Sequence, residues 1–208
     1  MSGRANVMQP ESARLPRVKR LIVVAGPCCA GKSTLIAALQ RGELPMLRKT
    51  LEMDDPLDWA YVHAYELPGL SGMYAEHLVL HYDFQAQRSL NGYRFLAGLL
   101  RNADHAAFLT LQVQPEMLVR RNRSRLAGVA GAFFRRPKNV SRFVRRLRDI
   151  ANRHFLYRDP HAVSGLYDNW FRFCTACGGY AHWVVDASGE QAGWDLTAVN
   201  RESPRKAR

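Results

Sequence analysis

The sequence predicts an α/β fold in which helices cover both faces of a parallel β-sheet. The first observation is a continuous aliphatic run at residues 21–25, which is typical of a strand buried on both faces. The second is that similar apolar runs alternate along the chain with stretches of helical periodicity, the pattern of βαβ units. The third is the composition: 208 residues with 47% hydrophobic and 23% charged residues suit one domain with a substantial core.

Five strands and four helices are expected from these patterns. The strands are expected at residues 21–25, 49–53, 77–82, 106–113 and 181–186. The helices are expected at residues 33–40, 93–101, from Pro115 onward, and at 140–155. Gly42 follows the first helix where a C-terminal glycine cap is favoured. Ligands of such sheets bind beyond the carboxyl ends of the strands, so the site is expected there.

The chain is expected to consist of one domain between two basic tails. The domain spans residues 20–198 and includes an insert at about 126–180, while residues 1–19 and 199–208 form the tails. No apolar run is long enough to span a membrane, and the N-terminus lacks the apolar stretch of a secretory signal. The cysteines form two close pairs rather than a secreted disulfide framework, which favours a cytoplasmic location.

The net charge of +12 favours polyanionic partners: a nucleotide, a nucleic acid, an acidic membrane surface or a phosphorylated substrate. Part of this charge lies in the two tails, where basic residues are usually solvated. Most of the remaining positive charge lies in residues 120–158. A solvated surface explains this concentration of charge less well than it explains the tails.

A phosphate-binding motif follows the first expected strand. Its GxxxxGK[ST] pattern is matched in full by Gly26, Pro27, Cys28, Cys29, Ala30, Gly31, Lys32 and Ser33. Glycines let successive N–H groups converge on phosphate oxygens, and the following helix adds the positive end of its dipole. In such a loop the lysine reaches the β- and γ-phosphates, and the serine hydroxyl ligates magnesium. The sequence therefore predicts binding of a nucleoside triphosphate, ATP or GTP, with Mg²⁺.

With this loop, the chain resembles the P-loop kinases of small molecules, such as shikimate, gluconate and adenylylsulfate kinases and chloramphenicol phosphotransferase. The resemblance covers residues 20–186 and implies a five-stranded parallel sheet of order 2-3-1-4-5 with an Arg-rich helical lid. It also implies that Thr34 belongs to the nucleotide site and that the second substrate is a small-molecule hydroxyl.

The resemblance implies roles for three acidic residues. Asp54 and Asp55 follow the expected second strand, where these kinases often carry a carboxylate that binds the acceptor hydroxyl and takes its proton. An Asp-Asp-Pro turn explains the same residues structurally. Asp83 ends the apolar run HLVLHY and resembles the acidic residue that holds magnesium, although His81 and Tyr82 interrupt that run.

Arginines after the fourth strand complete the resemblance. Arg121 and Arg125 share a helical face, and the family uses arginines here to neutralise charge on the transferring phosphoryl group. Other candidates for this role are Arg120, Arg123, Arg135 and Arg136. The insert carries a helix with five further arginines to which no family motif assigns a role.

Two further signals are weak. Cys174 and Cys177 form half of a zinc motif without a second pair, so free thiols are the expected state. The aromatic residues between the second and third strands could stack on an acceptor or pack in the core: Trp59, Tyr61, Tyr65 and Tyr74.

The sequence thus predicts an ATP-dependent kinase that phosphorylates a hydroxyl of a small-molecule acceptor. The central basic run makes a kinase of nucleic-acid 5′-hydroxyl ends an alternative. A nucleotide-dependent switch or ATPase module is a second alternative, and a sulfotransferase with a related loop is a third.

Overall fold

A parallel β-sheet organises the computed structural model, which describes residues 15–66, 74–85, 90–135 and 140–189. All pairings are parallel, and the strand order is β2-β3-β1-β4-β5. This confirms the predicted α/β class, the parallel sheet and its strand order. The strands are β1 Arg17–Gly26, β2 Trp59–His63, β3 Tyr74–Asp83, β4 Ala103–Gln112 and β5 Ala181–Asp186.

Strand β1 occupies the centre because its sequence can be buried on both faces. Residues 21–26 are all buried, and β1 pairs with β3 on one side and β4 on the other. The pairing with β3 ends at Gly26 opposite Asp83, so both residues lie at the carboxyl edge of the sheet.

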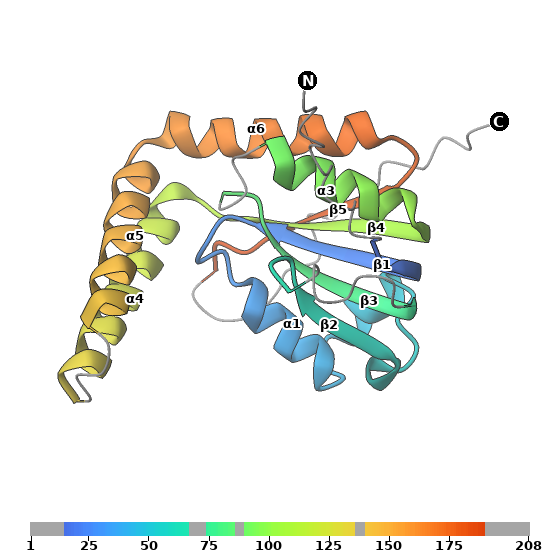
Figure 1. The fold of residues 1–208 in the computed structure, drawn as a ribbon, viewed down its shortest axis with the longest axis horizontal. Helices are drawn as coiled ribbons and strands as arrows, with labels where there is room; N and C mark the ends of the chain where they lie inside the picture. Colours follow the sequence, from blue (N-terminus) through green and yellow to red (C-terminus); the bar gives the residue numbers. More distant parts are fainter. Residues whose placement is uncertain (1–14, 67–73, 86–89, 136–139, 190–208) are drawn as a thin grey trace, which may run out of the picture.

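The helices form a layer on each face of the sheet. They are α1 Lys32–Gln40, α2 Pro45–Thr50, the short 3₁₀ helix η1 Pro56–Asp58, α3 Leu90–Arg101, α4 Pro115–Arg135, α5 Val140–Arg158 and α6 Pro160–Cys177. Helix α1 covers one face, and α3 and α6 cover the other (Figure 1). Helix α6 is anchored by Trp170, which is fully buried against Tyr82, Phe84 and Phe108.

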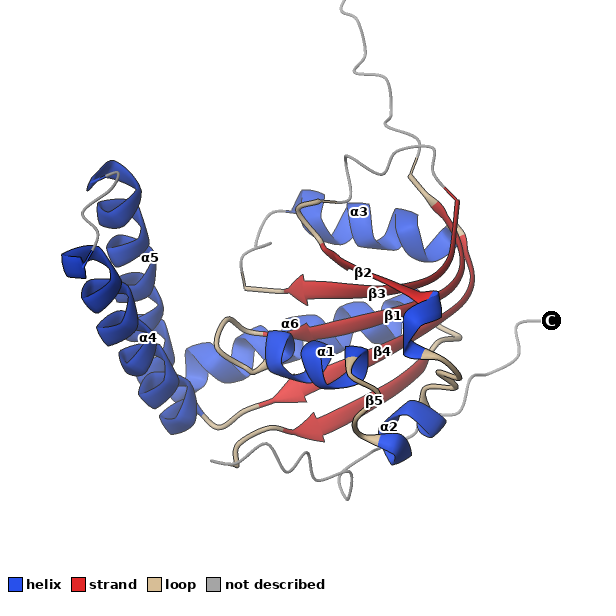
Figure 2. Ribbon diagram, turned by 90° about the horizontal axis from the view of Figure 1, so that it is seen from below, coloured by secondary structure: helices blue, strands red, loops and turns tan. Residues whose placement is uncertain are grey.

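Helices α4 and α5 form a hairpin that extends beyond the carboxyl edge of the sheet (Figure 2). Residues 115–158 are called the hairpin below. Its two helices pack on each other through apolar residues, for example the stacked rings of Phe133 and Phe143, whose centroids lie 3.8 Å apart. The predicted helices at Pro115 and at 140–155 are therefore confirmed as α4 and α5.

The expected insert at 126–180 divides differently in the structure. Helix α4 is continuous from Pro115, so the hairpin begins before residue 126. Residues 160–177 form α6, a helix that the sequence did not predict and that belongs to the core of the sheet. Of the weak zinc motif on this helix, Cys174 is buried and Cys177 is half-buried, and both are free thiols. Among the described residues no group of three or more His, Cys, Asp and Glu side chains is placed to hold a metal ion.

The expected second strand at residues 49–53 is wrong. Pro45 begins helix α2 there, and Leu47 on this helix is fully buried. The second strand is instead Trp59–His63, ten residues later. The other four strands lie where the sequence predicts them, and Gly42 follows α1 with a φ of +73° as expected of a glycine cap.

None of the helices in the described part of the chain has the length and apolar character needed to cross a bilayer. Residues 1–14 and 190–208, which contain most of the expected basic tails, lie outside the described residues, as does Arg136.

Candidate functional site

The loop between β1 and α1 lies at the centre of the carboxyl edge and shows the backbone geometry that its glycines predict. A Cβ on Gly26 would lie 3.0 Å from Cβ of Ala30 and 3.2 Å from the carbonyl oxygen of Leu111, so only glycine fits. Gly31 has a φ of +99°, which glycine adopts without strain. Cys29 has a φ of +69°, which is uncommon for a residue with a side chain. The loop therefore holds a constrained, tightly curled backbone.

Lys32, at the start of α1, lies beneath this loop. Its side chain is only 3% exposed, and its Nζ donates hydrogen bonds to the carbonyl oxygens of Gly26 and Pro27 at 2.8 and 2.7 Å. Nζ also lies 3.9 Å from Oδ2 of Asp83 at the end of β3. Burial lowers the pKa of Lys32, and the charge of Asp83 opposes that effect. The ammonium is thus held by oxygen atoms of the loop and of the neighbouring strand.

The first turn of α1 presents hydrogen-bond donors to solvent. Gly31 at the N-cap has no side chain to accept from the first N–H groups, and the first turn contains no acidic residue. Ser33 and Thr34 are exposed in this turn. The combination of free N–H groups, the helix dipole and a lysine suits an anion such as a phosphate group.

The hairpin contacts the loop through three side chains of α4. Arg121 donates to the carbonyl oxygens of Ala30 at 3.4 Å and of Ala187, after β5, at 2.7 Å. Arg125 donates to Sγ of Cys28 at 3.1 Å. Asn122 is buried: its Oδ1 lies 3.9 Å from Sγ of Cys29, and its amide nitrogen donates to the carbonyl oxygen of Ile150 in α5. The structure therefore brings both predicted arginines to the loop, while Arg120 and Arg123 lie on another side of α4, and the side chain of Arg135 lies outside the described residues.

Tyr157 in α5 connects the hairpin to the loop a second time. Its fully buried hydroxyl lies 2.7 Å from the carbonyl oxygen of Cys28 and 2.5 Å from Oε1 of Gln85. Both of these oxygens are acceptors and a phenol has one proton, so the Tyr157 hydroxyl donates to one of them at a time. Burial raises the pKa of Tyr157, so this donor stays protonated.

Cys28 and Cys29 in the loop differ in acidity. The thiol of Cys29 hydrogen-bonds to Cys28, and this bond, with Arg153 and Arg125 nearby, lowers the pKa of Cys28 to about 6 despite its burial. The same interaction and burial raise the pKa of Cys29. Cys28 is therefore the more acidic of the two thiols.

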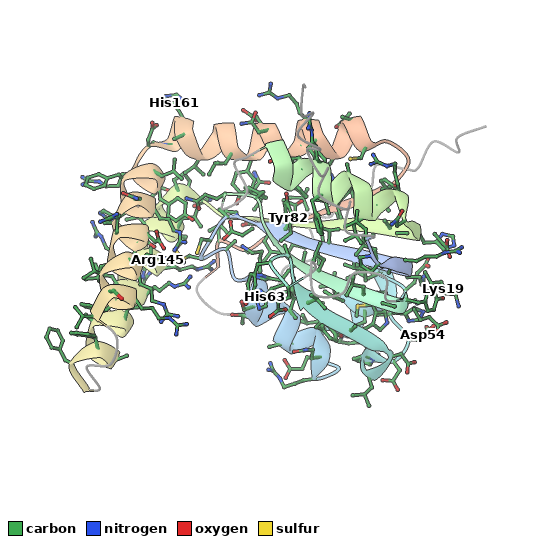
Figure 3. The ribbon with its side chains drawn as sticks, in the orientation of Figure 1. Lys19, Asp54, His63, Tyr82, Arg145 and His161 are labelled. Carbon is green, nitrogen blue, oxygen red and sulfur yellow. The ribbon has the colours of Figure 1, made fainter. Side chains whose placement is uncertain are left out.

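Asp54 and Asp55 do not lie at this site, contrary to their predicted position after the second strand. They precede η1 and β2 and so lie near the amino edge of the sheet. The first residue of β2, Trp59, pairs with His77, which is six residues before Asp83, or about 20 Å along the strand. Asp55 caps η1 by accepting from the N–H of Leu57. Figure 3 shows Asp54 beside the amino ends, close to Lys19 and away from the loop.

A pair of histidines, rather than the two aspartates, lies at the carboxyl ends of β2 and β3. His63 ends β2, and its Nδ1 lies 2.7 Å from Nδ1 of His81 on β3. This short contact requires one ring to donate and the other to accept. Burial, Lys32 and His63 together lower the pKa of His81 to about 4, so His81 is neutral at physiological pH. His81 and Asp83 project from the same face of β3, toward Lys32.

The segment after β2 adds an aromatic ring and a carboxylate beside the histidines. Tyr65 is 75% exposed and stacks on His63 with ring centroids 5.0 Å apart. Glu66 accepts a hydrogen bond from the N–H of His63. The histidines were not predicted from the sequence, because β2 was expected earlier in the chain and His81 was considered only as an interruption of an apolar run. Of the four aromatic candidates, Trp59 is buried, Tyr61 is half-buried and Tyr74 begins β3 at the amino edge.

Comparisons of this chain with protein-family models, with curated proteins and with solved structures found no match.

Replacement of Tyr157 by Phe should destabilise the protein by about 1–3 kcal/mol, because the buried carbonyl of Cys28 loses its donor. Urea unfolding measures this change. Tyr65→Phe is the matched control, since that side chain is largely exposed and should change stability by less than about 0.5 kcal/mol. Equal stability of the two variants would show that the Tyr157 hydrogen bond contributes nothing.

Alkylation of the folded protein by iodoacetamide should show Cys28 reacting with an apparent pKa near 6. Its rate should rise through pH 6 and level off near neutrality, because the thiolate is the reactive form and its population is then complete. Cys174 should stay unreactive over this range, because burial raises its pKa. Mass spectrometry of the labelled peptides gives both profiles. A Cys28 profile that climbs only above about pH 8, as for an ordinary thiol, would contradict the assignment.

Proposed function

We propose that this protein is a kinase that transfers the γ-phosphoryl group of ATP, with Mg²⁺, to a hydroxyl of a small-molecule acceptor. The observation that carries the proposal is the position of Lys32: its buried ammonium joins the β1–α1 loop to Asp83 at the ends of adjacent strands. The surrounding GxxxxGKS sequence and the resemblance to small-molecule kinases support the same conclusion.

The β1–α1 loop supplies the phosphate half of the proposed site. The N–H groups of the loop and of the first turn of α1 bind the phosphate oxygens, and Lys32 moves from its loop carbonyls to the β- and γ-phosphates. Arg121 and Arg125 already contact the loop and can neutralise charge on the transferring group.

Mg²⁺ fits the oxygen-bearing side chains beside the loop. The exposed hydroxyl of Ser33 and the carboxylate of Asp83 would hold the ion, and phosphate oxygens and water would complete its shell. Such a shared site needs only one or two protein ligands. The ion would lower the repulsion between the phosphates and the incoming hydroxyl oxygen.

The histidine pair supplies the acceptor half. The lowered pKa of His81 favours its neutral form, so we assign the proton in the pair to Nδ1 of His63, which donates to Nδ1 of His81. Nε2 of His63 then carries a lone pair that can accept a proton. Neutral His81 orients the ring of His63 by accepting its Nδ1–H hydrogen bond, also when His63 becomes protonated. The exposed ring of Tyr65 extends this half of the site toward solvent.

The reaction is then an in-line displacement. The acceptor oxygen forms a bond to the γ-phosphorus, and the bond between that phosphorus and the β–γ bridging oxygen breaks, releasing ADP. The proton of the acceptor hydroxyl passes to Nε2 of His63 and returns to solvent after the products leave. No further reactant is needed.

Transfer to a nucleic-acid 5′-hydroxyl is the second candidate. The observation that favours it is the concentration of arginine on the hairpin, directly beyond the loop. Screening small hydroxylated metabolites and 5′-hydroxyl oligonucleotides for ADP release distinguishes the two candidates.

Replacement of Lys32 by Ala should lower phosphoryl transfer by about a hundredfold or more, because a charge at the transferring group is lost. ADP release with the acceptor found by the screen measures this loss. Lys49→Ala removes the same charge from an exposed position on α2 and should leave the rate unchanged. Full activity of the Lys32 variant at saturating MgATP would end the kinase proposal.

Replacement of His63 by Asn should lower turnover by about a hundredfold while nucleotide affinity stays near normal. The Asn amide can still donate to Nδ1 of His81, so the variant removes the base and keeps the pair's hydrogen bond. Asp54→Asn and Asp55→Asn should retain turnover within about threefold, because both residues lie at the opposite edge of the sheet.

Turnover and equilibrium nucleotide binding should be measured on the same preparations of these three variants. A large loss in either aspartate variant, with His63→Asn fully active, would move the acceptor site away from the histidine pair.

A further inference from the structure

The net charge of the protein is concentrated in the hairpin. Residues 115–158 contain 13 of the 30 Lys and Arg residues but only two of the 18 Asp and Glu residues, Glu116 and Asp149. The hairpin therefore carries +11 of the total charge of +12, and the remainder of the chain is nearly neutral. Of the 13 basic residues, 12 are arginine, whose planar fork binds phosphate oxygens in pairs and stacks on flat rings.

The basic side chains and several apolar ones are exposed together. On α5, Arg145, Arg146 and Arg148 are exposed, and Phe155 on the same helix is 71% exposed. Phe134 near the end of α4 is 80% exposed. Helix α5 has 19 residues and is about 28 Å long, so this surface could accompany several nucleotides of an extended strand. Figure 3 shows Arg145 on the hairpin, which stands clear of the sheet.

A pocket lies at the base of the hairpin, the end nearest the sheet, and could hold a small group of a ligand. Its volume is about 530 Å³, within the range of small-ligand sites, and it lies where α4 meets the end of α5 and the start of α6. Val119, Tyr157 and Pro160 contribute apolar lining. The charged lining consists of three guanidinium groups and one carboxylate: Arg120, Arg123, Arg158 and Glu116. Apolar walls with cations around them suit a base or sugar that carries phosphate groups.

An anionic bilayer is a poorer match for this surface. An interfacial helix needs one continuous apolar face, but the apolar face of α5 already packs on α4 through Phe143 and Ile150. The apolar residues that remain exposed on α5 are interrupted by Arg148. Attraction to an anionic bilayer depends on the number of positive charges, and lysine serves as well as arginine. The excess of arginine in the hairpin is therefore not explained by a bilayer.

We propose that the hairpin binds single-stranded nucleic acid, with the strand along the arginines of α5 and one nucleotide in the pocket beside Tyr157. Guanidinium groups contact the phosphates, and the exposed phenyl rings stack on bases. This binding is independent of the proposed phosphotransfer, because it uses none of Lys32, Asp83 or His63.

Fluorescence anisotropy of labelled single-stranded RNA and DNA, about 20 nucleotides long, tests the proposal on the full chain without ATP. We expect affinity that weakens steeply with salt, since each phosphate contact contributes about −0.7 to the slope of log K against log salt concentration. Replacing Arg145, Arg146 and Arg148 together by Gln should weaken binding at least tenfold at about 100 mM KCl and reduce the slope by about 2.

The matched control replaces Arg17, Arg101 and Arg172 by Gln, which removes the same charge from exposed positions outside the hairpin. It should change affinity by less than about threefold. Arg123→Gln with Arg158→Gln should weaken binding about fivefold or more if a nucleotide occupies the pocket. Lys32→Ala should bind the strand normally, so failure of the kinase proposal leaves this result unaffected.

Two outcomes would overturn the proposal. The first is equal loss of affinity in the hairpin and control triple variants, which would mean that net charge alone attracts the strand. The second is no binding of either strand even at about 50 mM KCl. Cosedimentation with vesicles of phosphatidylserine and phosphatidylcholine, in the absence of strand binding, would assign the surface to a membrane instead.

Discussion

The buried ammonium of Lys32 is the constraint on which the carboxyl edge of the sheet depends. A charge removed from water is costly unless oxygen atoms surround it, and here two loop carbonyls and the carboxylate of Asp83 do so. This requirement fixes the curl of the β1–α1 loop and its distance from β3. The same requirement makes the lysine available to a phosphate group, which would satisfy its charge better than neutral carbonyls do.

Strand β3 connects the β1–α1 loop to the histidine pair because it lies between β1 and β2. Asp83 at its end meets Lys32, while His81, two residues earlier on the same face, meets His63. Burial, and then the charge of Lys32, keep the ring of His81 neutral. The loop and the histidine pair are therefore electrostatically linked, and in the proposed reaction His63 is the histidine that accepts the proton.

The sequence predicted the parts of this arrangement that depend on local pattern. Strand β1, its loop and Asp83 follow from an aliphatic run and a fixed motif spacing. The second strand was misplaced because the five residues of β2 lack a long apolar run, and their pairing with β3 is decided by contacts distant in sequence. As a result, Asp54 and Asp55 were predicted at the carboxyl edge instead of the amino edge, and His63 was not predicted as a site residue. Helix α6 was missed because its aromatic residues face a core that only the folded sheet defines. The link from Tyr157 to Cys28 spans 129 residues, and no local pattern could indicate it.

The hairpin is joined to the rest of the protein near its base, where Tyr157 contacts the loop and Asp159 begins α6. Helix α5 runs about 28 Å from this joint to its far end, so a rotation of about 10° at the joint would displace that end by about 5 Å. A change in the β1–α1 loop that rotated the hairpin without altering the sheet would therefore be largest in its effect around Phe134.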